Sequence, residues 1–106
     1  MEKNLENKLL DDLTCDGYGF LYRAIITCAV LKPKSPDIIS ALKELKDDQH
    51  LIIGHPLSEY VNAALDVIGV ERYTGNDSFM KELITTRFEW FRDLVENEVE
   101  NGDYKT

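Results

Sequence analysis

The segment 18–31 constrains the fold of this chain most strongly, because it is apolar around nearly its whole helical circumference. It reads YGFLYRAIITCAVL, and its strongly polar side chains, Arg23 and Thr27, stand four residues apart. On a helix these two side chains would form one narrow polar line. A helix that is apolar on its other faces must be covered by other elements, and this segment is well short of the roughly 20 residues needed to cross a bilayer. We therefore predict a buried central helix over residues 18–31.

The flanking sequence supplies amphipathic segments that can cover such a helix. Leucines at helical spacing predict a first helix over residues 4–13. The Ser-Pro-Asp run at 35–37 combines a capping residue, a proline suited to the first helical position and an acid that favours the positive end of the helix dipole. The helix that it opens ends near residue 48 or continues to residue 54, and a short buried strand at 51–53 is the remaining alternative.

Two further helices follow in the second half of the chain. His55 and Pro56 open one of them, and Gly69 stands where a left-handed cap residue would end it. The last helix runs from about residue 78 to residue 101.

These segments together predict an all-α fold. At 106 residues, the chain has the length of one domain. We predict a single helical domain over 1–106, built as a bundle of about five helices around the central helix 18–31. Residues 1–3 and 102–106 are expected to be frayed.

The charge of the chain is strongly negative. It carries 20 acidic and 12 basic residues, which gives a formal net charge of −8 and a pI near 4.6. Binding to nucleic acid or to an anionic membrane requires clustered lysine and arginine, so we predict neither. The balance favours a basic protein partner, although acidity also serves solubility alone.

The amino-terminal stretch is polar and lacks the apolar run of a signal peptide, so we expect a cytoplasmic protein with reduced cysteines. Cys15, Cys28, His50 and His55 are the candidate soft ligands, and their spacing matches no zinc motif. The chain contains no Gly-x-Ser-x-Gly elbow and no glycine-rich phosphate loop. We therefore predict a non-enzymatic protein without metal or cofactor.

The last helix carries a wide apolar stripe, typical of core packing. On an uninterrupted α-helix the stripe consists of Met80, Ile84, Phe88, Phe91 and Val95, with Leu83 and Leu94 on one flank. Arg87 projects near the middle of the stripe, where a guanidinium needs a carboxylate or several carbonyl oxygens. We predict a structural ion pair for Arg87 with Asp66, Asp16 or Glu59; an anion-binding role and an extension to solvent are the alternatives.

The opposite face of the same helix is acidic, with Glu82, Glu89, Asp93, Glu96 and Glu100. Like charges at i and i+4 destabilise an isolated helix by about 0.2–0.5 kcal/mol per pair, and the acids gather at the end where the helix dipole disfavours them. The arrangement is either a solvated face or a docking surface for a basic partner. Trp90 borders this face together with Phe79 and is typical of an interface anchor, although it also fits the rim of the core.

A second acidic and aromatic cluster stands near the first turn. It consists of Asp11, Asp12, Asp16 and Tyr18. It would extend the docking surface if the first and last helices lay side by side.

These features predict a small acidic protein that binds and inhibits a basic partner. The specific expectation is a bacterial immunity or antitoxin protein that covers the cationic cleft of a toxin such as a nuclease, because such a cleft must be positive to hold phosphate. The alternative is a small regulatory or adaptor subunit that acts through an apolar interface, including a homodimer. An enzyme or ligand-binding domain without a recognisable motif is the third possibility.

Overall fold

Residues 18–31 form one helix, as the apolar segment predicted. The structure, a computed structural model, describes the backbone of residues 3–100 and the side chains of residues 4–97. The helices are α1 (Lys3–Leu13), α2 (Tyr18–Leu31), α3 (Pro36–Glu44), α4 (Leu57–Ile68) and a long carboxy-terminal helix made of α5 (Asp77–Glu82), η1 (Leu83–Phe88) and α6 (Glu89–Glu100). Two short strands, β1 (Leu51–Ile52) and β2 (His55–Pro56), precede α4. The predicted all-α bundle of about five helices is confirmed for the described residues.

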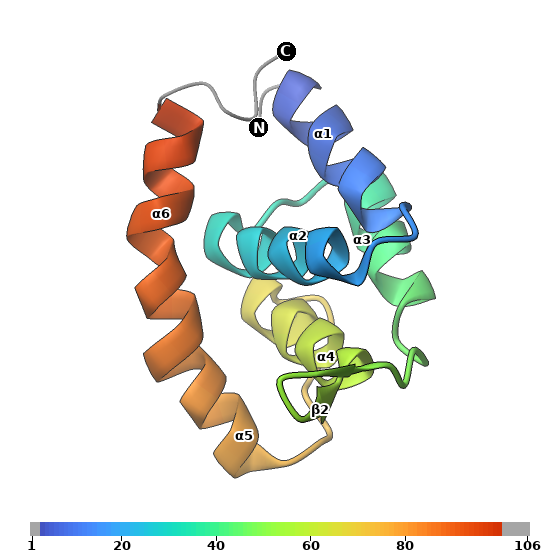
Figure 1. Cartoon of the computed structure of the whole chain (residues 1–106), viewed down its shortest axis with the longest axis vertical. Coiled ribbons are helices and arrows are strands. Elements are labelled where there is room, and N and C mark those ends of the chain that lie inside the picture. Colours follow the sequence, from blue (N-terminus) through green and yellow to red (C-terminus); the bar gives the residue numbers. More distant parts are fainter. Residues whose placement is uncertain (1–2, 101–106) are drawn as a thin grey trace.

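Helix α2 lies at the centre of the molecule, with α1 and α3 on one side, α4 below it and α6 on the other side (Figure 1). Its side chains from Ala24 to Ala29 are all buried. The hydroxyl of Thr27 donates to the carbonyl oxygen of Arg23 at 2.8 Å, which satisfies it inside the core. Within residues 3–100, no helix combines the length and apolar character needed to cross a membrane.

Helices α1 and α3 pack against each other as well as on the core. Four leucines of α1 were predicted to lie at helical spacing. Leu5, Leu9 and Leu13 are buried, whereas Leu10 is half-buried and packs against the core. Ser35 occupies the N-cap position of α3, as predicted, but its hydroxyl makes no cap bond. It donates instead to the Glu6 carboxylate, and so ties the start of α3 to α1.

Residues 51–56 form an antiparallel hairpin in which Ile52 pairs with His55. Helix α3 ends at Glu44, so both predicted endpoints of that helix are wrong. The strand alternative was nearer, but β1 is not buried: Leu51 is 62% exposed and Ile52 is half-buried. Ile53, in the turn that follows, is 65% exposed. Ile53 and Gly54 both have positive φ, +52° and +81°, as the two-residue type I′ turn of a hairpin requires.

Helix α4 follows the hairpin as predicted, beginning immediately after Pro56. Its inner side chains are buried from Leu57 to Ile68. Gly69 ends the helix with φ +94°, and the amide of Val70 donates to the carbonyl oxygen of Leu65 at 2.9 Å. This is the left-handed cap that the sequence predicted.

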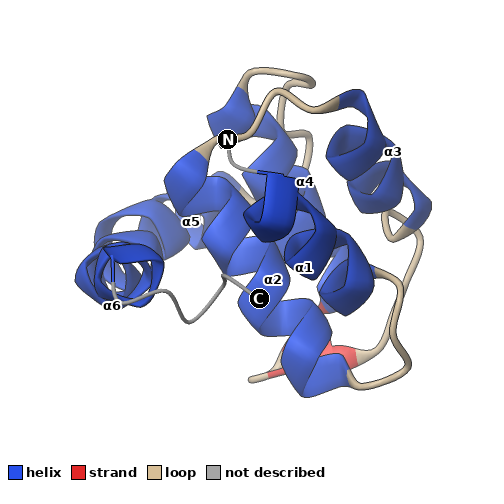
Figure 2. Cartoon of the chain, turned by 90° about the horizontal axis from the view of Figure 1, so that it is seen from above, coloured by secondary structure: helices blue, strands red, loops and turns tan. Residues whose placement is uncertain are grey.

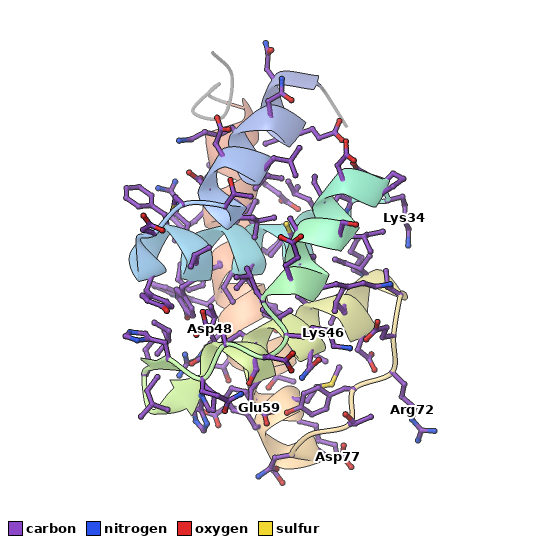
Figure 3. The ribbon with its side chains drawn as sticks, turned by 90° about the vertical axis from the view of Figure 1, so that its right-hand side faces the viewer. Lys34, Lys46, Asp48, Glu59, Arg72 and Asp77 are labelled. Carbon is purple, nitrogen blue, oxygen red and sulfur yellow. The ribbon has the colours of Figure 1, made fainter. Side chains whose placement is uncertain are left out.

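The loop after α4 is fixed by polar contacts to the helices around it. The amide of Tyr73 donates to Asp66 Oδ2 at 2.7 Å, and the hydroxyl of Tyr73 donates to the Glu59 carboxylate. Glu71 forms ion pairs with Lys43 and Lys46 at the end of α3. The loop therefore brings α5 back beside α4, and Figure 3 shows Glu59 and Asp77 at this end of the molecule.

The long carboxy-terminal helix contains a π-helical turn, η1, that the sequence analysis did not anticipate. A π turn holds one more residue than an α turn, so the two ends of the helix do not share one regular apolar stripe. Leu83 and Phe88, five residues apart, are both buried, whereas Ile84 is exposed. The predicted inward position of Ile84 is therefore wrong, as is that of Leu94, which is also exposed.

The predicted boundaries of the last helix agree with the structure to within one residue over the described part. Asn76 caps the helix, with its side chain accepting from the amides of Ser78 and Phe79. The predicted fraying at residues 102–106 lies outside the described residues, as do residues 1 and 2. Lys3 begins α1.

Candidate protein-binding face

The outer side of α6 carries the carboxylates that the sequence analysis singled out. Glu89, Asp93 and Glu96 are all exposed, and their spacing places them on one side of the helix. We call these three residues the acidic face. Glu82 is also exposed but precedes the π turn, so it does not continue the same row. The side chain of Glu100 lies outside the described residues.

No side chain of the acidic face forms an ion pair with any residue that the structure describes. The ion pairs present join Lys8 to Asp12 and both Lys43 and Lys46 to Glu71. Figure 3 views the molecule from the side opposite α6 and shows Lys34, Lys46 and Arg72 there, with Arg72 extending away from the body of the molecule. These three cations thus lie on the side of the molecule away from the acidic face.

Trp90 lies beside the acidic face and is 66% exposed. Its indole packs nearly perpendicular to the ring of Phe91, with 4.6 Å between ring centroids, and Phe91 in turn contacts Tyr22 of α2. Leu94, one turn later, is exposed on the same flank. Phe79, which was predicted to share this border position, is instead buried and stacks on His55. The π turn explains this error, because it rotates α5 relative to α6.

Arg87 lies in the π turn and points toward two tyrosines. Its Nη1 donates to the hydroxyl of Tyr60 at 2.9 Å and to that of Tyr22 at 3.4 Å. It makes no ion pair with any residue in the described part of the chain. The predicted structural ion pair is therefore corrected: two candidate carboxylates, Glu59 and Asp66, accept hydrogen bonds from Tyr73 instead.

Burial and hydrogen bonding shift the pKa values of Arg87 and Tyr60. Burial lowers the pKa of Arg87, but the hydrogen bonds and charge interactions with Tyr22 and Tyr60 outweigh this effect and raise it. Burial raises the pKa of the Tyr60 hydroxyl, and the nearby positive charge of Arg87 partly offsets the increase. The guanidinium is therefore a permanent cation held by neutral phenols.

The second predicted cluster does not extend the acidic face. Helices α1 and α6 lie on different sides of α2 (Figures 1 and 2), so the condition for that extension is not met. Asp12 is paired with Lys8 at 3.4 Å, whereas Asp11 and Asp16 are exposed. Tyr18 stacks on His50, with 3.7 Å between ring centroids, and its hydroxyl donates to Asp48 at 3.3 Å. The ring and the hydroxyl of Tyr18 thus both contact residues of this chain.

The candidate soft ligands are dispersed. Cys28 is a core side chain, and its burial raises the pKa of the thiol to about 12. The thiol of Cys15 donates to the carbonyl oxygen of Asp12 at 3.1 Å. His50 and His55 each stack on a different aromatic ring. Over the described residues, no group of three or more His, Cys, Asp and Glu side chains could hold a metal ion.

Two features of the structure were not predicted from the sequence. The first is the tyrosine pair around Arg87, which comes from two different helices and leaves no local signal. The second is the hairpin with its exposed apolar side chains, Leu51 and Ile53. The hairpin does have a local signal, the Ile-Gly dipeptide immediately before His55 and Pro56. In comparisons with known proteins, no family model, no curated protein and no solved structure matches the chain.

Proposed function

We propose that this protein is a non-enzymatic binding protein that covers a cationic surface of another protein with its acidic face and Trp90. One observation carries the proposal: Glu89, Asp93 and Glu96 are exposed in one row, and none forms an ion pair within the described part of the molecule. Complementary charge of this kind accelerates association and selects against acidic competitors.

The energetics of α6 support this role. Glu89 and Asp93 are like charges one turn apart, and such a pair costs about 0.2–0.5 kcal/mol in a helix. Residues 89–100 contain five carboxylates and one cation, Arg92. A cationic partner would relieve this repulsion, so the charge pattern that weakens the isolated helix would strengthen the complex.

Trp90 supplies the apolar part of the proposed interface. Tryptophan is enriched among the residues that contribute most to the free energy of binding at protein interfaces. The indole is supported from below by Phe91, which limits the rotamer freedom that binding would otherwise have to remove.

The partner that best fits this chemistry is a toxin with a positively charged cleft, such as a nuclease. A cleft that holds phosphate must present lysine and arginine, and a negative helix can occupy it in place of the nucleic acid. On this proposal the protein acts as a bacterial immunity or antitoxin protein. The small size and the net charge of −8 support such a role.

The test begins with affinity purification from the native host, using the full chain as bait, followed by binding kinetics with the purified partner. The triple variant E89K/D93K/E96K should lose binding while its helical circular dichroism persists. A matched control reverses three exposed acids on the α3 side, Asp37, Glu44 and Asp47, and should retain most of the affinity. Equal affinity of the two triple variants would refute the role of the acidic face.

Ionic strength provides an independent measurement. The association rate should decrease as sodium chloride rises from 20 to 300 mM, because screening shortens the range of charge attraction. The alternative function, an adaptor that dimerises through an apolar surface, is favoured by the exposure of Trp90 and Leu94. A concentration-dependent dimer in sedimentation equilibrium that Trp90→Ala abolishes and salt does not weaken would support that alternative.

A further inference from the structure

The guanidinium of Arg87 has one occupied edge and one open edge. Both hydrogen bonds leave from Nη1, to the hydroxyls of Tyr60 and Tyr22. A guanidinium has five N–H donors, so the three on Nε and Nη2 remain. Those three donate to no acceptor among the residues that the structure describes, and the side chain is only half-buried.

No carboxylate among residues 4–97 forms an ion pair with Arg87. Glu59 and Asp66, two of the three acids predicted to pair with Arg87, accept hydrogen bonds from the hydroxyl and the amide of Tyr73. The negative charge of Glu82 acts on Tyr60, but Glu82 forms no ion pair with Arg87. An arginine with a purely structural role is ordinarily paired with a carboxylate, because a partly desolvated charge is costly without one. Phenol hydroxyls orient the guanidinium without cancelling its charge.

The position of Arg87 is fixed before any ligand arrives. The ring of Tyr60 is completely buried, and its hydroxyl donates to the carbonyl oxygen of Ile52 at 2.7 Å. The hydroxyl proton of Tyr60 is therefore used in this hydrogen bond, and the hydroxyl oxygen accepts from Arg87. Tyr22 packs edge-on against the same ring, with 5.2 Å between centroids. Arg87 itself lies in a π turn, a rare conformation that is frequently found at functional sites.

We propose that Arg87 is a binding site for a carboxylate group, with Nε and Nη2 donating to its two oxygens. This edge of a guanidinium matches the planar geometry of a carboxylate and forms paired hydrogen bonds with it. A carboxylate also fits the surroundings better than phosphate does. The molecule carries a net charge of −8, which repels a dianion more strongly than a monoanion.

The aromatic side chains beside Arg87 suit a carboxylate attached to a polypeptide. Phe91 packs against both Tyr22 and Trp90, and these rings offer apolar contact to the carbon atoms that carry the carboxylate. The ligand is thus an aspartate or glutamate side chain, or a chain terminus. A partner that is cationic overall still contains such groups, so this site is compatible with the proposed function but does not depend on it.

The test is a titration of the full-length ¹⁵N-labelled protein, monitored through the arginine Nε–Hε resonances. Sodium propionate represents a side-chain carboxylate, sodium N-acetylalaninate represents a chain terminus, and sodium phosphate and sodium chloride are compared at equal ionic strength. The Arg87 resonance should shift saturably with a carboxylate, and whichever carboxylate saturates at the lower concentration identifies the source. Arg72 and Arg92, both exposed, are internal controls and should shift little.

The variant R87K keeps the positive charge but removes the planar fork. In the wild-type protein, a carboxylate should change the fluorescence of Trp90, the only tryptophan, and this change should be lost in R87K. Two results would overturn the proposal: an Arg87 shift no larger than that of Arg72, or a larger shift with phosphate than with either carboxylate. Both of these results are read from the titration of the wild-type protein. The proposal can therefore be tested even if R87K does not fold.

Discussion

The hydroxyl of Tyr60 accepts a hydrogen bond from Arg87 at 2.9 Å and donates one to the carbonyl oxygen of Ile52 at 2.7 Å. This one buried oxygen therefore joins α4, the π turn and the hairpin. The three elements come from separate parts of the chain, and each contributes to the side of the molecule that carries Arg87.

Replacing Tyr60 with phenylalanine should test this connection. The variant removes both hydrogen bonds and leaves the Ile52 carbonyl without its donor, which should lower the free energy of unfolding by about 1.5–3 kcal/mol. Urea denaturation measures the change. Tyr22→Phe is the matched control, since its longer hydrogen bond of 3.4 Å lies at a half-buried position. We expect a smaller loss of unfolding free energy in Y22F than in Y60F, and equal losses in the two variants would contradict this expectation.

Ile53 is an unusual residue for its position. Its φ of +52° is disfavoured for a β-branched side chain, and the side chain is mostly exposed. Ile53→Asn should therefore raise the free energy of unfolding by about 1 kcal/mol, because asparagine tolerates the left-handed region. Leu51→Asn is the control: it is equally exposed but is not among the residues with positive φ. If I53N is no more stable than L51N in urea, backbone strain at Ile53 is refuted.

A side chain at Gly75 would force two hydrogen-bonded side chains to move. A Cβ there would lie 2.5 Å from both Glu59 Oε2 and the hydroxyl oxygen of Tyr73. Gly75→Ala should separate these two groups and destabilise the protein by about 1–3 kcal/mol. Gly19→Ala is the matched control, because a Cβ at that helical position meets nothing within 4 Å and should stabilise by up to about 1 kcal/mol. Thermal unfolding of both variants tests the difference in sign.

The same Tyr73 hydroxyl predicts a dependence of stability on alkaline pH. Burial and the hydrogen bond to the Glu59 carboxylate raise the pKa of Tyr73, whereas an unfolded tyrosine ionises near pH 10. The folded state therefore keeps a proton that the unfolded state loses. Its contribution to stability is complete below about pH 9 and is lost as pH rises above about 10.

Urea denaturation between pH 8 and pH 11 measures this effect. The free energy of unfolding should fall above pH 10 in the wild-type protein and fall less steeply in Tyr73→Phe. Some decrease should remain in that variant, because burial also raises the pKa values of Tyr18 and Tyr60. Identical slopes in the two proteins would exclude Tyr73 as a source of the dependence.

The fold was largely predictable because its strongest signals are local. The apolar segment 18–31, the Ser-Pro-Asp start of α3 and the Gly69 cap depend on residues close together in sequence, and all three positions agree with the structure. The exposure of the acidic face was predictable for the same reason. Charged side chains at helical spacing opposite an apolar stripe have no other place to lie.

The π turn, the hairpin and the partners of Arg87 were not predictable in the same way. Phe88 can share a face with Ile84 in an α-helix or with Leu83 in a π turn, and packing against α2 decides between them. Strands of two residues are too short for a periodic pattern. Tyr22 and Tyr60 meet Arg87 only in three dimensions, across 65 and 27 residues of sequence.

The extra residue in η1 sets the direction in which the side chains of α6 point around the helix axis. One residue corresponds to a rotation of roughly 100° in an α-helix. If residues 83–88 lost a single residue and became α-helical, either α5 or α6 would turn its buried side chains toward water. The direction in which Glu89, Asp93 and Glu96 point is therefore set by the π turn that precedes them. Residues 83–88, which form this turn, include no acidic residue.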